Sequence, residues 1–419
     1  MKTLRFRSLF TKFNAWLAFL AAVIGGGVFA GYIVFTKGLV VTNLTDLVPW
    51  GLWITIDLSS IAMSAGAFLL CAAVYLLGLK RYQPVTRTAT FIGLIGYSMA
   101  MLTLLLDIGR PERFWHAYVW WNPHSLLWEV TICITFYFAV LFLETLPIIG
   151  ETTFMQKRFP SLAGKFESIH RLAPFLAIAG LGFSMLHQSS LGAAYGVLKA
   201  RPILYRPDLS VLFMVSAMAG GPALTVLISM LSSRLTRHAN VKDELLEKVS
   251  YFIGWVLVGY LYFRAWDTLS MTYTYEPGRT EGLSFLTKGP LAFNFWAVEI
   301  FLGAVIPIIL LLTSRFRKQP RLRMLALALV VCGVVAYRWD TNMAGQLVLL
   351  TYLPTEMVTR YASYFPSLIE IMAGAGVIAY GAMAITLGIR FLKIVDHKHG
   401  HQTDEAAVFT GETQPAAAD

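Results

Sequence analysis

The chain has 419 residues, of which 57% are hydrophobic and only 14% are charged. The mean hydropathy of +0.62 excludes a soluble globular protein, in which about 25% of residues are typically charged. Repeated apolar runs of about 20 residues predict an all-α polytopic membrane protein. The net charge of +10 leaves nucleic acid, anionic lipid and membrane topology open as explanations.

Cysteine and histidine usage argues against a metal site. The chain has three cysteines, each inside an apolar run, and no CxxC motif. Of the eight histidines, only His187 lies clearly within a predicted span, so a buried b-type haem lacks a second histidine ligand. We therefore expect no haem, Fe–S cluster or other metal in this chain.

Ten transmembrane helices are expected. They cover residues 14–36, 50–78, 88–109, 124–146, 172–197, 209–232, 249–270, 290–314, 324–343 and 366–393. The first span follows Lys2, Arg5 and Arg7 and could be a signal peptide, but it lacks a convincing cleavage site, so we expect a retained anchor. The tail, residues 396–419, has the composition of a disordered segment.

The distribution of basic residues predicts the orientation. With the N-terminus in the cytoplasm, inner segments hold 23 of the 34 Lys and Arg residues and outer segments hold nine. The positive-inside rule then places both termini in the cytoplasm. The outer connections are aromatic, as in residues 114–121, which could form an interfacial belt or a docking surface for a partner.

Ionisable residues inside the spans are costly in a membrane, and their default interpretation is functional. The candidates are Asp57, Asp107, Glu129, His187, Arg264, Asp267, Glu299, Arg338, Asp340 and Glu370. Counted at about 1.5 Å per residue from the span ends, all of them fall in the outer half of the membrane. A transporter that alternates access needs a midplane site with polar routes to both faces, so this asymmetry favours chemistry that opens outward.

Spacing predicts how some of these residues pair. Arg264 and Asp267 are three residues apart on one helix face, which favours an ion pair within the helix, and Asp107 and Arg110 have the same spacing. Either pair could simply neutralise a helix end. Arg338 and Asp340 point to opposite faces, so each must find partners on other helices.

The stretch that follows His187 is the most distinctive one. Gln188, Ser189 and Ser190 come directly after it within an apolar helix. An imidazole beside an amide and hydroxyls could donate to a carbonyl oxygen and exchange a proton near neutral pH. The alternative is a structural histidine whose hydrogen bonds are satisfied in the core.

A weak internal repeat suggests two bundles. Asn, Trp and Glu occur in that order in residues 122–129 and again in residues 294–299, four spans apart. Parallel repeats of this kind are known in membrane proteins. We expect these units: 1–48, the cytoplasmic N-terminus and first flanking helix; 49–205, a first four-helix bundle; 206–345, a second; 346–395, the last flanking helix with its outer loop; 396–419, the tail.

Together the ten spans, Asp-Ile-Gly-Arg at 107–110, the span entry at 123–129 and Leu-His-Gln-Ser-Ser-Leu-Gly at 186–192 resemble the polysulfide reductase membrane-subunit (NrfD-like) family. The resemblance extends to about residue 393 and is closest to its long form, similar to hydrogenase-2-type and cytochrome c3:menaquinone reductase membrane subunits. It implies a subunit of an anaerobic respiratory complex rather than a stand-alone enzyme. The subunit would exchange electrons between a ferredoxin-like Fe–S subunit on the periplasmic face and menaquinone, in the direction of quinone reduction.

The resemblance also implies roles for residues and partners. A hydrogenase, molybdopterin-type or multihaem cytochrome c subunit would head the complex, and no nucleic acid is expected. The quinone would bind in the first bundle. The implied residues are, as catalytic groups, His187, Asp107 and Glu129; as quinone-binding groups, His187, Gln188, Asp57 and Ser189; as a proton relay in the second bundle, Arg264, Asp267, Glu299, Arg338 and Asp340. A proton-coupled secondary transporter and a purely structural anchor remain alternatives.

Overall fold

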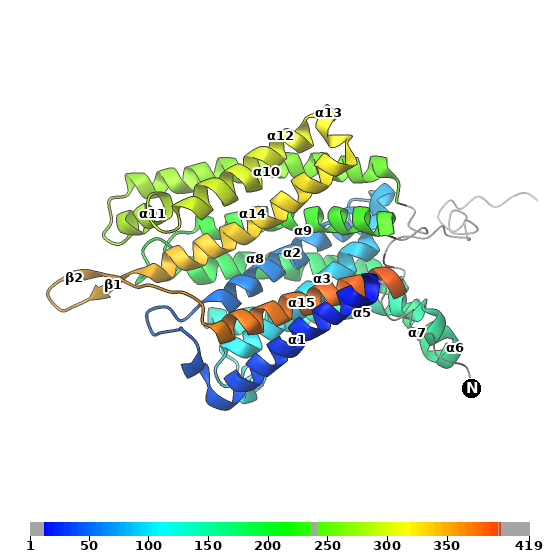
Figure 1. Ribbon diagram of the computed structural model, residues 1–419, viewed down its shortest axis with the longest axis horizontal. Coiled ribbons are helices and arrows are strands. Elements are labelled where there is room, and N and C mark those ends of the chain that lie inside the picture. Colours follow the sequence, from blue (N-terminus) through cyan, green and yellow to red (C-terminus); the bar gives the residue numbers. More distant parts are fainter. Residues whose placement is uncertain (1–11, 236–240, 393, 395–419) are drawn as a thin grey trace, which may run out of the picture.

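The computed structural model describes residues 12–235, 241–392 and 394. The tail predicted to be disordered and the basic residues Lys2, Arg5 and Arg7 lie outside the described residues. Within the described part, long helices run side by side along one axis (Figure 1). The chain is an all-α polytopic membrane protein, as predicted.

The helices follow the predicted spans closely. The long ones are α1 (Lys12–Lys37), α2 (Leu52–Tyr75), α3 (Gln83–Asp107), α5 (Leu126–Gly150), α8 (Ala173–Gly196), α9 (Asp208–Leu235), α10 (Asp243–Tyr273), α14 (Pro320–Leu347) and α15 (Leu368–Phe391). A π-helix, η6 (Asn294–Val305), continues into α12 (Ile306–Leu312). Short helices in the connections are η2 (Leu39–Val41), η3 (Lys80–Tyr82), η4 (Pro111–Arg113), α4 (His116–Val119), α6 (Thr153–Arg158), α7 (Pro160–Ser168), η5 (Ile169–Leu172), α11 (Arg279–Thr287) and α13 (Ser314–Arg317).

Among the described residues, nine helical segments are long and apolar enough to cross a membrane. The predicted span at 249–270 lies within α10, which is 31 residues long but does not belong to the nine. Arg264, Asp267 and several tyrosines lower its hydropathy. The count of ten is therefore not confirmed, although α10 runs the length of the bundle and packs against α9 and α12 (Figure 1).

Helix α2 forms the centre of the molecule and α1 lies at its edge. In their apolar windows 83% of the α2 residues are buried, against 22% for α1. Helix α2 packs against α3, α8, α9 and α14, whereas α1 packs mainly against α15. Helices α2 and α9 approach closely because Gly66 has no side chain: a Cβ there would lie 1.8 Å from the carbonyl oxygen of Ala217. We call α2, α3, α5 and α8 the first group, and α9, α10, η6 with α12, and α14 the second group.

One β-hairpin interrupts the helical fold and was not predicted. Strands β1 (Val348–Tyr352) and β2 (Met357–Tyr361) pair antiparallel and extend beyond the ends of the helices (Figure 1). Both strands are rich in β-branched and aromatic residues, which favour strands. The outer connection before α15 is therefore an ordered ribbon.

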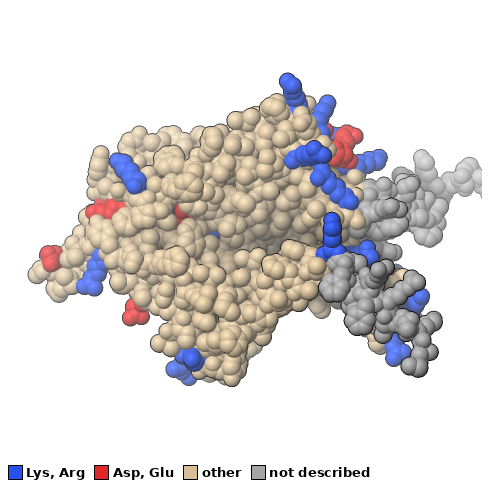
Figure 2. Space-filling model, in the orientation of Figure 1, with Lys and Arg blue, Asp and Glu red and all other residues tan. Residues whose placement is uncertain are grey.

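Charge marks one end of the bundle. The first described residues of α1 and the last residues of α15 lie at the same end (Figure 1). On the face shown in Figure 2, most Lys and Arg residues gather at that end, over α13, α6 and α7. We call it the basic end. The opposite end carries the hairpin, α4 and α11.

Candidate functional site

His187 is fully buried in the half of α8 that lies away from the basic end. A hydrogen bond of 2.5 Å joins its Nδ1 to the hydroxyl of Tyr97 on α3. Its Nε2 has no hydrogen-bond partner among the described residues. Because nearly all buried polar atoms are paired, this free imidazole nitrogen marks a place where a ligand or water would complete the pairing.

Two glycines bring the helices around His187 together. A Cβ at Gly96 would lie 2.8 Å from the carbonyl oxygen of Ser60, so α3 and α2 approach closely beside Tyr97. A Cβ at Gly192 would lie 2.5 Å from the Cα of Ser210, so α8 and α9 approach closely as well. Gly192, the last residue of the motif at 186–192, therefore allows close packing of α8 against α9.

Asp57 lies near this histidine–tyrosine pair, and Asp107 lies near Asp57. Asp57 on α2 is 3% exposed, and its Oδ1 has no partner among the described residues; the same is true of Asp107 Oδ1 at the end of α3. Asp57 lies within electrostatic range of both Asp107 and Tyr97. The ion pair expected between Asp107 and Arg110 does not form in the described structure, because α3 ends at Asp107 and Gly109 takes a left-handed φ of 72°.

Of the two serines after Gln188, only Ser190 bonds to Glu129. The Ser190 hydroxyl donates to Glu129 Oε1 at 2.7 Å, which joins α8 to α5. Ser189 instead donates to the backbone of its own helix, at the Leu186 carbonyl. Of these three residues, Glu129 thus connects to the polar stretch of α8, and Ser189 does not point into the same cluster.

The amide oxygen of Gln188 meets α14. Its Oε1 accepts a hydrogen bond of 3.2 Å from Arg338 Nη2, and its Nε2 has no partner in the described part of the chain. The same Nη2 donates to the Phe213 carbonyl at 3.0 Å and to the Ser216 hydroxyl at 3.1 Å. The structure therefore places Arg338 beside Gln188, and in the described part of the chain Arg338 makes no ion pair with the other residues predicted as a relay.

Those other residues form a buried ion network in the second group. Arg264 donates to Asp267 Oδ2 at 2.7 Å and to Glu299 Oε1 at 2.8 Å, so the expected pair within α10 forms. Arg206 pairs with the second oxygen of Asp267 at 2.6 Å. Tyr260 donates to Glu299 at 2.7 Å. Two cations and two anions neutralise each other here, so the network is electrically balanced.

Asp340 extends this network from α14. Its Oδ1 accepts a bond of 2.8 Å from Asn294 on η6, and the carboxylate lies beside Glu299. Its Oδ2 has no partner among the residues that the structure describes. As expected from their spacing, Arg338 and Asp340 find partners on different helices.

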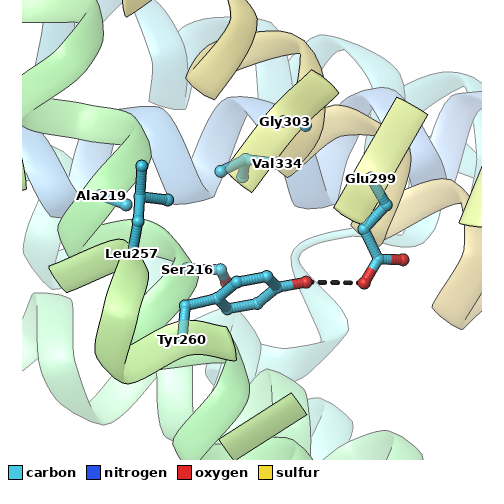
Figure 3. Close-up of a pocket in the computed structure, with 8 residues that line it drawn as sticks. Ser216, Ala219, Leu257, Tyr260, Glu299, Gly303 and Val334 are labelled. Carbon is cyan, nitrogen blue, oxygen red and sulfur yellow. Dashed lines mark hydrogen bonds between the residues drawn. The ribbon is translucent and has the colours of Figure 1, made fainter. Parts of the chain in front are cut away.

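A small cavity opens beside the ion network (Figure 3). The lining residues are Ser216, Ala219, Leu257, Tyr260, Glu299, Gly303, Gly333 and Val334. Figure 3 shows Tyr260 and Glu299 joined by their hydrogen bond at its wall. The volume of the cavity that the centre of a water molecule can occupy is about 10 Å³. This is on the order of the space that one water requires. The cavity does not include His187 or Gln188.

Glu370, the remaining candidate carboxylate, has a structural environment. It accepts hydrogen bonds from the Tyr364 hydroxyl and from the backbone nitrogens of Asn43 and Ser367. Burial first, and then the hydrogen bond to Glu370, raise the pKa of Tyr364 far above its usual value, so its hydroxyl remains a donor. Glu370 therefore ties the start of α15 to the segment before α2.

Tyr97 and Tyr260 are the polar side chains that the sequence did not reveal. Both tyrosines lie inside apolar helices that contain other aromatic residues, and no spacing distinguishes them. Within the described ranges no three His, Cys, Asp or Glu residues come together as a possible metal site. The expectation of a chain without haem or metal stays a prediction.

Comparison with known proteins supports the resemblance seen in the motifs. The family model described as "Polysulphide reductase, NrfD" matches residues 40–350. The "Menaquinone reductase, integral membrane subunit" of Nitratidesulfovibrio vulgaris is 35% identical over 93% of this chain and 93% of its own length. A selenate reductase subunit of Mesobacillus selenatarsenatis is 27% identical over 92% of this chain and 95% of its own length.

A relative from Archaeoglobus fulgidus is named for menaquinol. This "Hdr-like menaquinol oxidoreductase integral membrane subunit" is 24% identical over 92% of this chain and 95% of its own length. The family model covers most of the chain, and the match to the Nitratidesulfovibrio protein covers nearly all of both proteins. The chain belongs to the NrfD, polysulphide reductase, family of membrane proteins.

Proposed function

We propose that this chain is the quinone-reactive membrane subunit of a respiratory oxidoreductase and that it reduces a quinone, menaquinone in the first instance. The observation that carries this proposal is the fully buried His187, which is hydrogen-bonded at Nδ1 to Tyr97 and unpartnered at Nε2 within the described structure. A quinone carbonyl oxygen is the kind of acceptor that such a nitrogen could bind. The quinone head would enter from the lipid and lie about 10 Å below the outer surface.

The names of the relatives support a quinone as the substrate. One relative is named a menaquinone reductase subunit and another a menaquinol oxidoreductase subunit. The first is the more similar of the two, at 35% identity, and we adopt its direction of electron flow. Quinone-binding roles for Gln188 and Asp57, and supporting roles for Asp107 and Glu129, are part of this proposal, whereas Ser189 is a weak candidate because it bonds to its own helix.

His187 would supply a proton at a defined atom. Reduction of a quinone consumes two electrons, which an external partner provides, and two protons. When the Tyr97 hydroxyl donates a hydrogen bond to Nδ1, the neutral imidazole carries its proton on Nε2. As that proton passes to a reduced quinone oxygen, the Tyr97 hydroxyl proton moves to Nδ1, and the tyrosinate then regains a proton from water. Asp57, which lies near Tyr97 and has an oxygen without a partner among the described residues, is the candidate source of the second proton.

The second group would have a secondary role. Arg264, Asp267, Glu299 and Asp340 form one connected network beside a cavity with room on the order of one water, so they could hold protons or water. Arg338 makes no ion pair with this network among the described residues, and its side-chain acceptors are Gln188 and Ser216. In our proposal, proton transfer in the second group therefore involves four of the five residues that the sequence suggested.

Electrons would arrive at the end opposite the basic end. The proposal assigns that end to the periplasmic side, the basic end and both termini to the cytoplasm, and the membrane to the bacterial inner membrane. A ferredoxin-like Fe–S subunit would cover the outer connections, where Trp115, Trp120 and Trp121 are exposed. A hydrogenase, a molybdopterin-type enzyme or a multihaem cytochrome c would head the complex.

Replacing His187 by alanine tests the proposal. In the purified complex, H187A should lower quinone reduction by more than about 100-fold, because general acid catalysis of this kind contributes at least that much. The matched control is H170A, since His170 belongs to the short helix η5 in a connection on the basic side. Subunit yield after purification reports assembly, and both variants should keep it.

Near wild-type quinone reduction by assembled H187A would place the site elsewhere. A structural anchor predicts that result for every residue named above. A secondary transporter predicts substrate uptake into liposomes by the isolated chain and no stoichiometric Fe–S partner after purification. The composition of the purified complex therefore separates the three kinds of protein.

A further inference from the structure

Arg338 is a cation buried between the two helix groups without a counter-ion. It is 0% exposed, and in the described part of the chain no carboxylate pairs with it; its electrostatic neighbours are Tyr337, Tyr260 and Tyr195. Its Nε and Nη1 have no hydrogen-bond partner there. The ring centroid of Phe213 lies 3.7 Å from its guanidinium carbon, which compensates part of the charge through a cation–π contact. A charge kept in the membrane interior at this cost calls for a functional explanation.

The only side chains that accept hydrogen bonds from Arg338 in the described structure are Gln188 and Ser216. Arginine carries donors and no acceptor, so the amide atom of Gln188 that faces it must be the oxygen. The amide nitrogen is then forced to the opposite side. Arg338 therefore fixes which way round the Gln188 amide stands.

The amide nitrogen of Gln188 has nothing to donate to in the described structure. The residue is 0% exposed, and its Nε2 has no hydrogen-bond partner. Two buried N–H donors without an acceptor are expensive unless a bound molecule supplies one. Gln188 is the chain neighbour of His187, whose Nε2 is also unpartnered among the described residues.

We propose that Arg338 is a positioning residue of the quinone site: it holds the Gln188 amide so that its N–H donors face a carbonyl oxygen of the bound quinone. The inference rests on the proposed function. It moves Arg338 out of the second-group ion network and makes α14 part of the site in the first group. A ligand without a carbonyl acceptor gains nothing from this arrangement.

A double-mutant cycle on the purified complex tests this role. R338M removes every donor, and Q188A removes the amide; each should raise the KM for a soluble quinone analogue by about tenfold, the effect of one lost hydrogen bond at a buried site, with a smaller change in kcat. If Arg338 acts through Gln188, the double variant should be no worse than either single variant. R338K keeps a donor for the amide oxygen, so its KM should stay within about threefold of the wild type.

If the KM of the double variant rises about 100-fold, the two effects multiply and Arg338 acts independently of Gln188. That result would overturn the proposal. An unchanged KM in R338M would overturn it as well. If R338M does not assemble, R338Q replaces it: its neutral amide can still donate to Gln188. A KM about tenfold higher in R338Q would show that the charge acts and the positioning does not.

The same preparations separate this inference from the proposed function. If H187A abolishes turnover while R338M leaves the KM unchanged, only the role of Arg338 fails. If H187A turns over at the wild-type rate, the quinone site itself is misplaced. Quinone reduction by the wild-type complex is the common reference for both.

Discussion

At the scale of single residues, three polar atoms that are unpartnered in the described structure favour the first helix group as the site of a ligand. In the first group, His187 Nε2, Asp57 Oδ1 and Asp107 Oδ1 are buried and lack partners among the described residues. In the second group, the Arg264 guanidinium lies between two carboxylates that neutralise it. Unpartnered buried atoms of the described structure also occur in the second group, at Asp340 Oδ2 and Arg338 Nε, so it is their combination with a protonatable histidine that makes the first group the better candidate for binding a ligand.

Removing the Tyr97 hydroxyl should slow the reaction without affecting the fold. In Y97F the bond to His187 Nδ1 is lost, so the imidazole loses both its orientation and its proton source, and kcat for quinone reduction should fall by roughly 10- to 100-fold. Steady-state kinetics of the purified complex measure this change.

Tyr137 provides the matched control for that variant. It is a fully buried tyrosine whose ring centroid lies 4.5 Å from that of Tyr97, and its own hydroxyl has no hydrogen-bond partner in the described structure. Y137F should therefore keep the wild-type rate. Equal rates in Y97F and Y137F would contradict a role for the tyrosine–histidine bond.

At the scale of elements, the π-helix η6 and the β-hairpin were not predicted from the sequence. The π-helix η6 has the same apolar composition as the α-helices, and no residue in it indicates a π-helix rather than an α-helix. π-Helical segments are rare and often occur at functional sites, and this one carries Glu299, Asn294 and a wall of the cavity. The β-hairpin escaped prediction because its apolar residues 348–350 directly follow α14 and are too few to form a membrane span of their own.

Two pairs with the same separation of three residues had different outcomes. The Arg264–Asp267 pair followed from a separation of three residues because α10 continues through both positions. The Asp107–Arg110 pair had the same separation, but the helix stops at the first residue of the pair. Spacing thus predicts a pair only where the helix boundary is also known, and it does not say which helix Arg338 faces.

Breaking the ion network of the second group should destabilise the protein. In E299Q, Arg264 loses one of its two carboxylates and an excess positive charge remains buried, at a cost of about 3 kcal/mol. A lower apparent melting temperature of the purified complex reports the loss. E244Q breaks the exposed pair with Lys248 and should leave that temperature unchanged.

Equal melting temperatures for E299Q and the wild type would contradict the description of this network as a balanced, buried unit. They would indicate that water reaches Glu299 through the cavity and screens the charge. The cavity, with room on the order of one water, makes the comparison informative.

At the scale of the whole molecule, length and composition sufficed to predict a polytopic helical protein, because each span needs about 20 apolar residues in a row. The central position of α2 did not follow from its sequence, since α1 is even more apolar and yet lies at the edge. Hydropathy identifies a membrane helix, but contact with other helices depends on small residues such as Gly66 and on side chains far away in the chain.

The site likewise combines residues that are distant in sequence. His187 and Gln188 were recognisable because they are adjacent and polar within an apolar helix. Their partners Tyr97 and Arg338 lie 90 and 150 residues away, and these side chains reach α8 only in the assembled bundle, where α8 itself packs against α2, α5 and α9. The quinone site proposed here is therefore a property of the assembled bundle.

Photolabelling with a reactive menaquinone analogue tests the central claim most directly, because it reports where the quinone head lies without relying on turnover. After illumination of the wild-type complex and digestion, the labelled peptides should come from α8 around His187 and from α3 around Tyr97, and excess menaquinone should prevent the labelling. Labelling confined to α10 and η6, around Tyr260 and Glu299 at the cavity, would contradict the account and move the quinone to the second group.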